Sequence, residues 1–171
     1  AEIFYATENV TIKVVDEASN VRKLNIKYNN SIIKGVNYHL IGDFQIDNLQ
    51  TALQSLFLLD NSPDVSAIRR GVEKTRLRGR MELIHDEPLV YYDVAHNQES
   101  IKKVLNNIIF FYPEKEINII IALKRDKDYQ AIGQEIAKVG DRVFAYSMND
   151  ENYHSSAKLT AFWKKKKKNL V

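Results

Sequence analysis

Three polar side chains stand close together in the segment YYDVAHNQES, residues 91–100. Asp93, His96 and Asn97 leave an apolar run, LVYYDV, that is typical of a strand buried on both faces. A carboxylate at the end of such a strand is costly unless it has a partner. Asn97 alone has a structural explanation, because asparagine can cap the helix that follows. Spacing and residue type favour a ligand-binding function for the trio, and a purely structural function is the alternative.

A second polar cluster, KRDKD, follows the next apolar run, INIIIAL; its members are Lys124, Arg125, Asp126, Lys127 and Asp128. In open α/β sheets, ligands bind outside the carboxyl ends of the strands, where loops and helix N-termini present unpaired N–H groups. A crossover makes the two strands neighbours, so we expect both clusters to face one pocket. The alternative for this loop is an ordinary mixed-charge surface.

The segment RLRGR places Arg76, Arg78 and Arg80 around Gly79. Arginine presents a planar fork of donors that suits phosphate or carboxylate, and a glycine lets the backbone approach a ligand closely. Alone, the segment is weak evidence of a binding site, because such a basic linker is more often solvated.

Several common motifs are missing from the sequence. It contains no G-x-x-x-x-G-K-[ST] phosphate loop, no G-x-G-x-x-G, no G-x-S-x-G elbow and no pair of histidines at metal-ligand spacing. The sequence therefore offers no candidate metal ligand. A bound nucleotide would also lack the usual glycine-rich phosphate-binding loop within these residues.

The elements that must position these side chains follow from hydrophobic periodicity. In the second half, the strand at LVYYDV precedes a helix with Ile101 and Leu105 inward, the strand INIIIAL, a helix closed by Gly140, and the strand RVFAYS. A weaker helical pattern follows through Leu159 and Phe162. Alternating strands and helices are typical of a parallel sheet with right-handed crossovers. We predict an α/β fold whose C-terminal part is a Rossmann-like, doubly wound, mostly parallel sheet.

The first half of the chain has a different hydrophobic pattern, typical of antiparallel strands followed by helices. Apolar residues alternate with polar ones before and after the turn signal Asn29-Asn30, which predicts an antiparallel meander. A helix begins after Gly42, and a second helix is expected with Ser62 as its cap and Pro63 in its first turn. We place a domain boundary in the RLRGR region, giving domains at residues 1–76 and 77–171.

Composition excludes several classes of protein. The 171 residues include no cysteine, so neither a disulfide framework nor a thiolate metal site is available, and a reducing compartment, the cytoplasm, is expected. Five lysines, Lys164 to Lys168, account for the positive net charge; without them the chain has 20 basic and 22 acidic side chains, so no nucleic-acid partner is expected. The apolar runs are too short to span a bilayer, and no signal-peptide pattern opens the sequence, so we expect a soluble protein.

Four segments in this order, GDFQIDNLQTAL, RLRGRMELI, YYDVAHNQES and IALKRDKDY, resemble the successive signatures of folylpolyglutamate synthase and dihydrofolate synthase, members of the Mur ligase superfamily. The similarity covers residues from about 40 to 135. Enzymes of this family join a carboxylate to the amine of an amino acid, usually L-glutamate, with ATP and Mg²⁺. The carboxylate becomes an acyl phosphate, which the amine then attacks, so positioned cations must spread the transferring charge.

The resemblance implies particular functions for single residues. Gln45 and Asn48 would lie on the helix that approaches the nucleotide. Arg80 would reach the ATP phosphates and stabilise the transition state, which makes it both a cofactor-binding and a catalytic candidate. Asp93 would contact the nucleotide, at its ribose.

The remaining implied residues concern the amino acid. His96 would hold the incoming glutamate or orient the acyl phosphate, as the second catalytic candidate, with Asn97 supporting its loop. Lys127 and Asp128 would form part of the pocket wall. The implied partners are L-glutamate and folate or dihydropteroate, and we expect a monomer.

The sequence also departs from the family pattern. The family's phosphate loop and Mg²⁺ ligands belong to an N-terminal ATPase domain, of which residues 1–76 resemble only the closing portion. Many members have histidine where this chain has Phe44 and proline where it has Gln98. We therefore expect the C-terminal part of such a ligase, inactive alone. The alternatives are a non-catalytic module that binds nucleotide or glutamate on the same scaffold, and a fragment of a peptidoglycan Mur ligase.

Overall fold

The computed structural model describes residues 3–7, 9–29, 31–59 and 63–164. The chain divides into two compact units, Ala1–Asp93 and Val94–Val171. Among the described residues, no helix combines the length and the apolar character needed to cross a bilayer.

The first unit opens with an antiparallel sheet in the order β1-β2-β3, formed by β1 (Val10–Ala18), β2 (Val21–Tyr28) and β3 (Ser31–Tyr38). Alternate residues of β2 point inward, and Leu24 and Ile26 are fully buried. The predicted meander is confirmed, and Asn29 adopts the positive φ of 47° that a tight turn requires. The second residue of the predicted turn, Asn30, lies outside the described residues.

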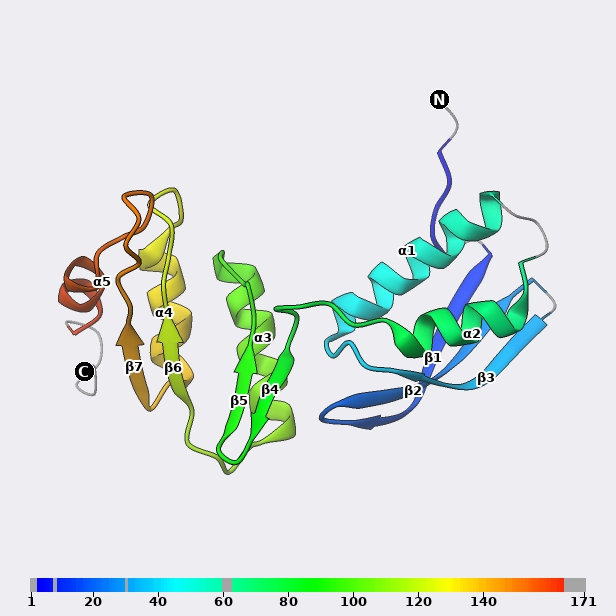
Figure 1. Cartoon of the computed structure of the whole chain (residues 1–171), viewed down its shortest axis with the longest axis horizontal. Coiled ribbons are helices and arrows are strands. Elements are labelled where there is room, and N and C mark those ends of the chain that lie inside the picture. The colour runs from blue at the N-terminus through cyan, green and yellow to red at the C-terminus, as the bar shows by residue number, and fades with distance from the viewer. Residues whose placement is uncertain (1–2, 8, 30, 60–62, 165–171) are drawn as a thin grey trace. The chain divides into compact units, whose positions relative to one another are not determined.

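Two helices pack on this sheet: α1 (Asp43–Leu59) and α2 (Val65–Lys74). Both lie against the same face in Figure 1, and their buried side chains join those of the strands in one core that includes Leu49, Phe57 and Ile68. This burial holds both helices against the sheet.

The cap of α2 differs from the prediction. The helix begins at Val65, and the carboxylate of Asp64 accepts a hydrogen bond of 2.9 Å from the Ser66 N–H. Ser62 lies outside the described residues, and Pro63 precedes the helix rather than opening it. Serine and aspartate both suit an N-cap, so residue type alone does not specify where the helix begins.

A hairpin completes the first unit, with β4 (Glu82–Asp86) antiparallel to β5 (Leu89–Tyr92). The sequence predicts β5 as the first strand of the parallel sheet, buried on both faces. In the structure Leu89, Val90 and Tyr92 are between 38% and 45% exposed. An apolar run predicts a strand, but it does not specify which strand pairs with it.

The second unit alternates helices and strands: α3 (Gln98–Phe111), β6 (Asn118–Ile121), α4 (Tyr129–Val139), β7 (Arg142–Ala145) and α5 (Ser156–Trp163). β6 and β7 pair in parallel with α4 between them in the chain, and α4 lies behind this pair in Figure 1. The core of this second unit includes Ile121, Ile132 and Val143. Antiparallel strands and helices followed by a parallel pair confirm the predicted α/β class.

The weak helical pattern near the C-terminus is confirmed by α5. Leu159 is fully buried, and Trp163 lies against α4 with its indole N–H donating to the Tyr129 carbonyl over 3.1 Å. Gly133 of α4 permits this approach, because a Cβ there would lie 2.0 Å from the indole nitrogen.

Candidate functional site

The first two turns of α1 bring Gln45 and Asn48 together. The Asn48 amide donates to Gln45 Oε1 over 3.1 Å, and the Tyr38 hydroxyl donates to the Gln45 carbonyl over 3.2 Å. Gln45 is only 1% exposed, and its Nε2 group has no hydrogen-bond partner within the described part of the chain. A buried donor without a partner is costly, so this amide is a place where a bound acceptor would be stabilised.

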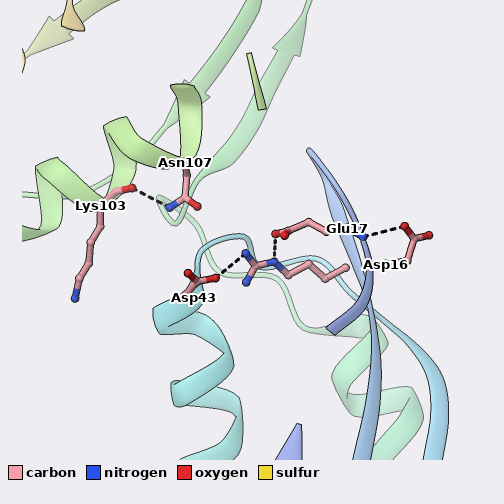
Figure 2. Close-up of polar contacts among 6 residues, drawn as sticks. Asp16, Glu17, Asp43, Lys103 and Asn107 are labelled. Carbon is pink, nitrogen blue, oxygen red and sulfur yellow. Dashed lines mark hydrogen bonds and ion pairs between the residues drawn. The ribbon is translucent and has the colours of Figure 1, made fainter. Parts of the chain in front are cut away.

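Arg22 of β2 anchors the beginning of the same helix. Its guanidinium, 3% exposed, bonds Glu17 and donates to Asp43, the first residue of α1, over 3.1 Å. In Figure 2, dashed lines join Glu17 and Asp43 to this guanidinium. Burial raises the pKa of Tyr38 to about 12, and the charge of Arg22 opposes that rise.

Sequence reasoning missed Arg22, although a signal exists. Arg22 has the same parity along β2 as Leu24 and Ile26, whose side chains are fully buried. A cation on the inward face of a strand requires carboxylate partners, which here fix the helix that carries Gln45.

Arg80 lies on a turn whose two neighbours have positive φ, 68° at Gly79 and 49° at Met81. The Gly79 N–H donates to Glu82 Oε2 over 2.8 Å, and the Met81 N–H donates to Asp93 Oδ2 over 2.8 Å. Gly79 and Met81 are buried, whereas Arg80 is exposed. Within the described residues no hydrogen bond or ion pair of the Arg80 side chain is recorded, so its guanidinium is available to an anion.

Asp93 therefore has a structural function that its position in the sequence did not reveal. Its carboxylate satisfies a backbone N–H twelve residues earlier, next to Arg80. The turn therefore supplies one of the partners that this partly buried carboxylate requires. The contact of Asp93 with a nucleotide ribose stays a prediction.

The segment with His96 and Asn97 is held by Ser100. Asn97 is the N-cap of α3, accepting from the Ser100 N–H over 2.8 Å, while the Ser100 hydroxyl oxygen accepts from the N–H groups of Asn97 and His96. This reciprocal capping box confirms the structural explanation of Asn97. His96 is exposed, and its Nδ1 lies 3.0 Å from the Val94 carbonyl, while no hydrogen bond of its Nε2 is found among the described residues.

A partly buried contact then ties α3 to α4. Gln98 Nε2 donates to Glu135 Oε1 over 2.9 Å, and Lys138 donates to Glu135 Oε2 over 2.6 Å. The bonds from Lys138 and Gln98 hold the pKa of the Glu135 carboxyl below its usual value. Gln98 thus makes a contact that the proline found in many family members could not make.

Lys127 and Asp128 lie at the N-terminus of α4. Asp128 Oδ1 accepts from the N–H groups of Gln130 and Ala131, each over 3.0 Å, so Asp128 is the N-cap of this helix. Lys127 pairs with Asp126 over 2.8 Å, and this bond lowers the pKa of the Asp126 carboxyl. The structure accounts for Asp128 without a ligand, and its place in a pocket wall stays a prediction.

His154 supports this loop from inside and was missed by sequence reasoning. It is 5% exposed, its ring meets Tyr129 edge-on, and its backbone N–H donates to the Leu123 carbonyl over 2.9 Å. Burial, followed by the charge of Lys158, lowers the pKa of His154 below its ordinary value. No motif marks His154, because its contacts come from a segment more than twenty residues away in the chain.

The structure therefore groups the predicted residues within each unit: Gln45 with Asn48, Asp93 with the turn of Arg80, His96 with Asn97, and Lys127 with Asp128. A single pocket for the clusters at His96 and Lys127 stays a prediction. Across the described residues, no group of three or more His, Asp or Glu side chains could hold a metal ion. The residues described do not fit a Mg²⁺ site of their own.

Comparison with known proteins supplies the family. Residues 79–169, more than half of the chain, match the family model described as Mur ligase, glutamate ligase domain. The UDP-N-acetylmuramoyl-L-alanyl-D-glutamate–2,6-diaminopimelate ligase of Buchnera aphidicola subsp. Baizongia pistaciae is 32% identical over 136 residues, 76% of this chain and 27% of the relative. The dihydrofolate synthase/folylpolyglutamate synthase of Bacillus subtilis is 32% identical over 95 residues, 53% of this chain and 22% of the relative.

A solved structure confirms the fold. The folylpolyglutamate synthase of Mycobacterium tuberculosis complexed with ADP superposes with a TM-score of 0.82 at 18% identity, covering 93% of this chain and 37% of that one. The chain spans about a quarter of the length of the curated relatives named above. By the match of its residues 79–169, the chain belongs to the Mur ligase family and carries its glutamate ligase domain.

Proposed function

We propose that this chain is the C-terminal part of an ATP-dependent ligase that adds L-glutamate to folate or dihydropteroate through an acyl phosphate. The four ordered sequence signatures support the folate substrates, as does the similarity to the Bacillus subtilis dihydrofolate synthase/folylpolyglutamate synthase. The ADP in the Mycobacterium tuberculosis structure supports a nucleotide cofactor.

The observation that carries the proposal is the exposed guanidinium of Arg80 on a buried, hydrogen-bonded turn. When bound, ATP supplies the phosphoryl group that activates the carboxylate. Phosphoryl transfer requires little covalent chemistry from the protein and depends on positioned charge. A cation fixed by its backbone, with no competing partner among the described residues, meets that requirement.

The other residues divide between nucleotide and amino acid. Gln45 offers a buried amide N–H without a partner in the described chain, Asn48 is exposed beside it, and both would face the nucleotide with Asp93. His96 is exposed and its Nδ1 contacts the Val94 carbonyl, so its Nε2 would accept a hydrogen bond from glutamate or donate one to it. Asn97 and Asp128 would act mainly by shaping their helix N-termini, with Lys127 next to them.

A second candidate function is favoured by a specific finding. The longest match to the curated relatives named above, 136 residues, is to a ligase named for 2,6-diaminopimelate. On that basis the chain would serve a peptidoglycan Mur ligase instead. The chemistry at Arg80 would be the same, and the acceptor and amino acid would differ.

The deciding experiment uses the full-length gene product that carries this chain. ATP-dependent addition of L-glutamate to dihydropteroate and tetrahydrofolate is measured beside addition of 2,6-diaminopimelate to UDP-N-acetylmuramoyl-L-alanyl-D-glutamate. Turnover of the folates alone supports the first proposal, and turnover of the muramyl substrate alone replaces it with the second. ATP binding without turnover of either would make the protein a non-catalytic binding module.

Arg80→Ala provides the residue-level test. We expect kcat to fall at least about 100-fold, the scale for removing one preorganised charge-stabilising donor, with the urea unfolding midpoint unchanged. Arg76→Ala is the matched control, because Arg76 is an exposed arginine of the same segment that donates to the carbonyls of Glu73 and Thr75. Unchanged kcat in Arg80→Ala would remove Arg80 from the site.

A further inference from the structure

The carboxylate of Glu82 has no function in the site as described so far, yet it is hydrogen-bonded to the turn that carries Arg80. Its Oε2 accepts from the Gly79 N–H over 2.8 Å and from Arg78 Nε over 3.0 Å, and its Oε1 lies 2.8 Å from the same Arg78 nitrogen. The Glu82 side chain is 24% exposed, whereas Arg78 is 86% exposed. One carboxylate therefore joins a buried backbone amide to a surface cation.

The turn needs this contact because its backbone is unusual. Both neighbours of Arg80 have positive φ, which a methionine such as Met81 rarely adopts. Each neighbour donates its N–H to a carboxylate, Gly79 to Glu82 and Met81 to Asp93. The two hydrogen bonds hold the backbone on either side of Arg80, and its side chain is left exposed.

Glu82 is also an acidic residue close to Arg80 in the sequence, two positions away. Both of its oxygens are already engaged by the Gly79 N–H and Arg78 Nε. The carboxylate thus supports the turn without neutralising the arginine that the turn presents.

We propose that Glu82 is a positioning residue for Arg80: by binding the Gly79 N–H, it fixes the turn from which Arg80 reaches the transferring phosphoryl group. The effect of Glu82 on catalysis rests on the proposed function. Its restraint on the turn rests only on the hydrogen bond from the Gly79 N–H. Arg78 contributes by occupying the remaining lone pairs of Glu82.

The geometric half is tested on the 171-residue chain by amide hydrogen exchange of Gly79, measured by NMR. Glu82→Ala removes the acceptor, and we expect Gly79 exchange to accelerate about tenfold, the scale of one lost hydrogen bond. Glu82→Gln retains a carbonyl acceptor and should restore most of the protection. Unchanged Gly79 exchange in Glu82→Ala would overturn the inference.

Glu73→Ala is the matched control. Glu73 pairs with Arg69 four residues earlier, as Glu82 pairs with Arg78, and no backbone N–H donates to its side chain among the described contacts. Loss of Glu73 should leave Gly79 exchange and ligase activity at their wild-type values. Faster Gly79 exchange in this control would mean that any lost surface pair loosens the turn, and would overturn the specific assignment to Glu82.

The catalytic half is tested in the full-length ligase by a double-mutant cycle. Glu82→Ala should lower kcat at least tenfold and Glu82→Gln by less than threefold, while adding Glu82→Ala to Arg80→Ala should cause no further loss, because Glu82 acts through Arg80. Multiplicative losses in the double variant would overturn the inference alone. Full activity of Arg80→Ala would instead refute the catalytic function proposed for Arg80, and the exchange measurement would still report whether Glu82 fixes the turn.

Discussion

Substituting Gly133 of α4 with alanine should destabilise the second unit, against the usual preference of helices for alanine. The new Cβ would lie 2.0 Å from Trp163 Nε1 and 2.4 Å from its Cδ1. The indole must therefore move, which also breaks its 3.1 Å hydrogen bond to the Tyr129 carbonyl.

The size of the effect follows from three contributions. Overpacking a filled core costs about 1–3 kcal/mol. The lost hydrogen bond adds about 1 kcal/mol, and the better helix propensity of alanine returns about 1 kcal/mol. The net loss in the free energy of unfolding is about 1–3 kcal/mol.

The matched control is Gly71→Ala in α2. A Cβ at Gly71 would meet nothing within 4 Å, and this glycine has no positive φ. Only the propensity gain then applies, so the first unit should be stabilised by up to about 1 kcal/mol. The two glycine substitutions should shift stability in opposite directions.

Urea unfolding measures both variants. Trp163 is the single tryptophan of the chain, so its fluorescence reports the second unit, while far-UV circular dichroism includes the first. Adding Trp163→Leu, followed by circular dichroism, should make Gly133→Ala tolerable because the smaller side chain vacates the contested space. A wild-type or higher unfolding midpoint for Gly133→Ala would refute the packing explanation.

Two further predictions concern the loops of the candidate site. Asn97→Ala should lower the stability of the second unit by about 1 kcal/mol through loss of the α3 cap, and Asn97→Asp should retain most of it; equal urea midpoints for Asn97→Ala and wild type would contradict the capping function. Because the pKa of His154 is lowered in the folded chain, the unfolded chain binds a proton at this ring more readily than the folded chain does. The stability that neutral His154 contributes is therefore fully present above pH 6.5 and is lost as the pH falls below 6.5. The urea midpoint should therefore drop between pH 7.5 and pH 5.5, and it should drop less in His154→Gln; the same drop in both would exclude His154 as the cause.

Local chemistry in the sequence was enough to predict several features. The cap at Asn97, the end of α4 at Gly140 and the meander of β1 to β3 each depend on residues within a few positions of one another. The four ordered signatures predicted the family, which the match of residues 79–169 confirms.

Other features depend on partners that spacing cannot identify. The Asp93 carboxylate binds a backbone N–H, that of Met81, and a backbone group has no side-chain signature. The apolar run of β5 predicted a strand but not its antiparallel pairing with β4. His154 depends on the packing of α5 and the KRDKD loop, which only the folded chain brings together.

The contact between Gln98 and Glu135 restrains the backbone next to the His96 segment. Proline, present at this position in many family members, restricts the backbone even in an unfolded chain. Gln98 exerts no such restriction, and its bond reaches a residue 37 positions away on α4. In this chain a contact between α3 and α4 therefore takes the place of the proline, and it adds to the local capping box of Asn97 and Ser100.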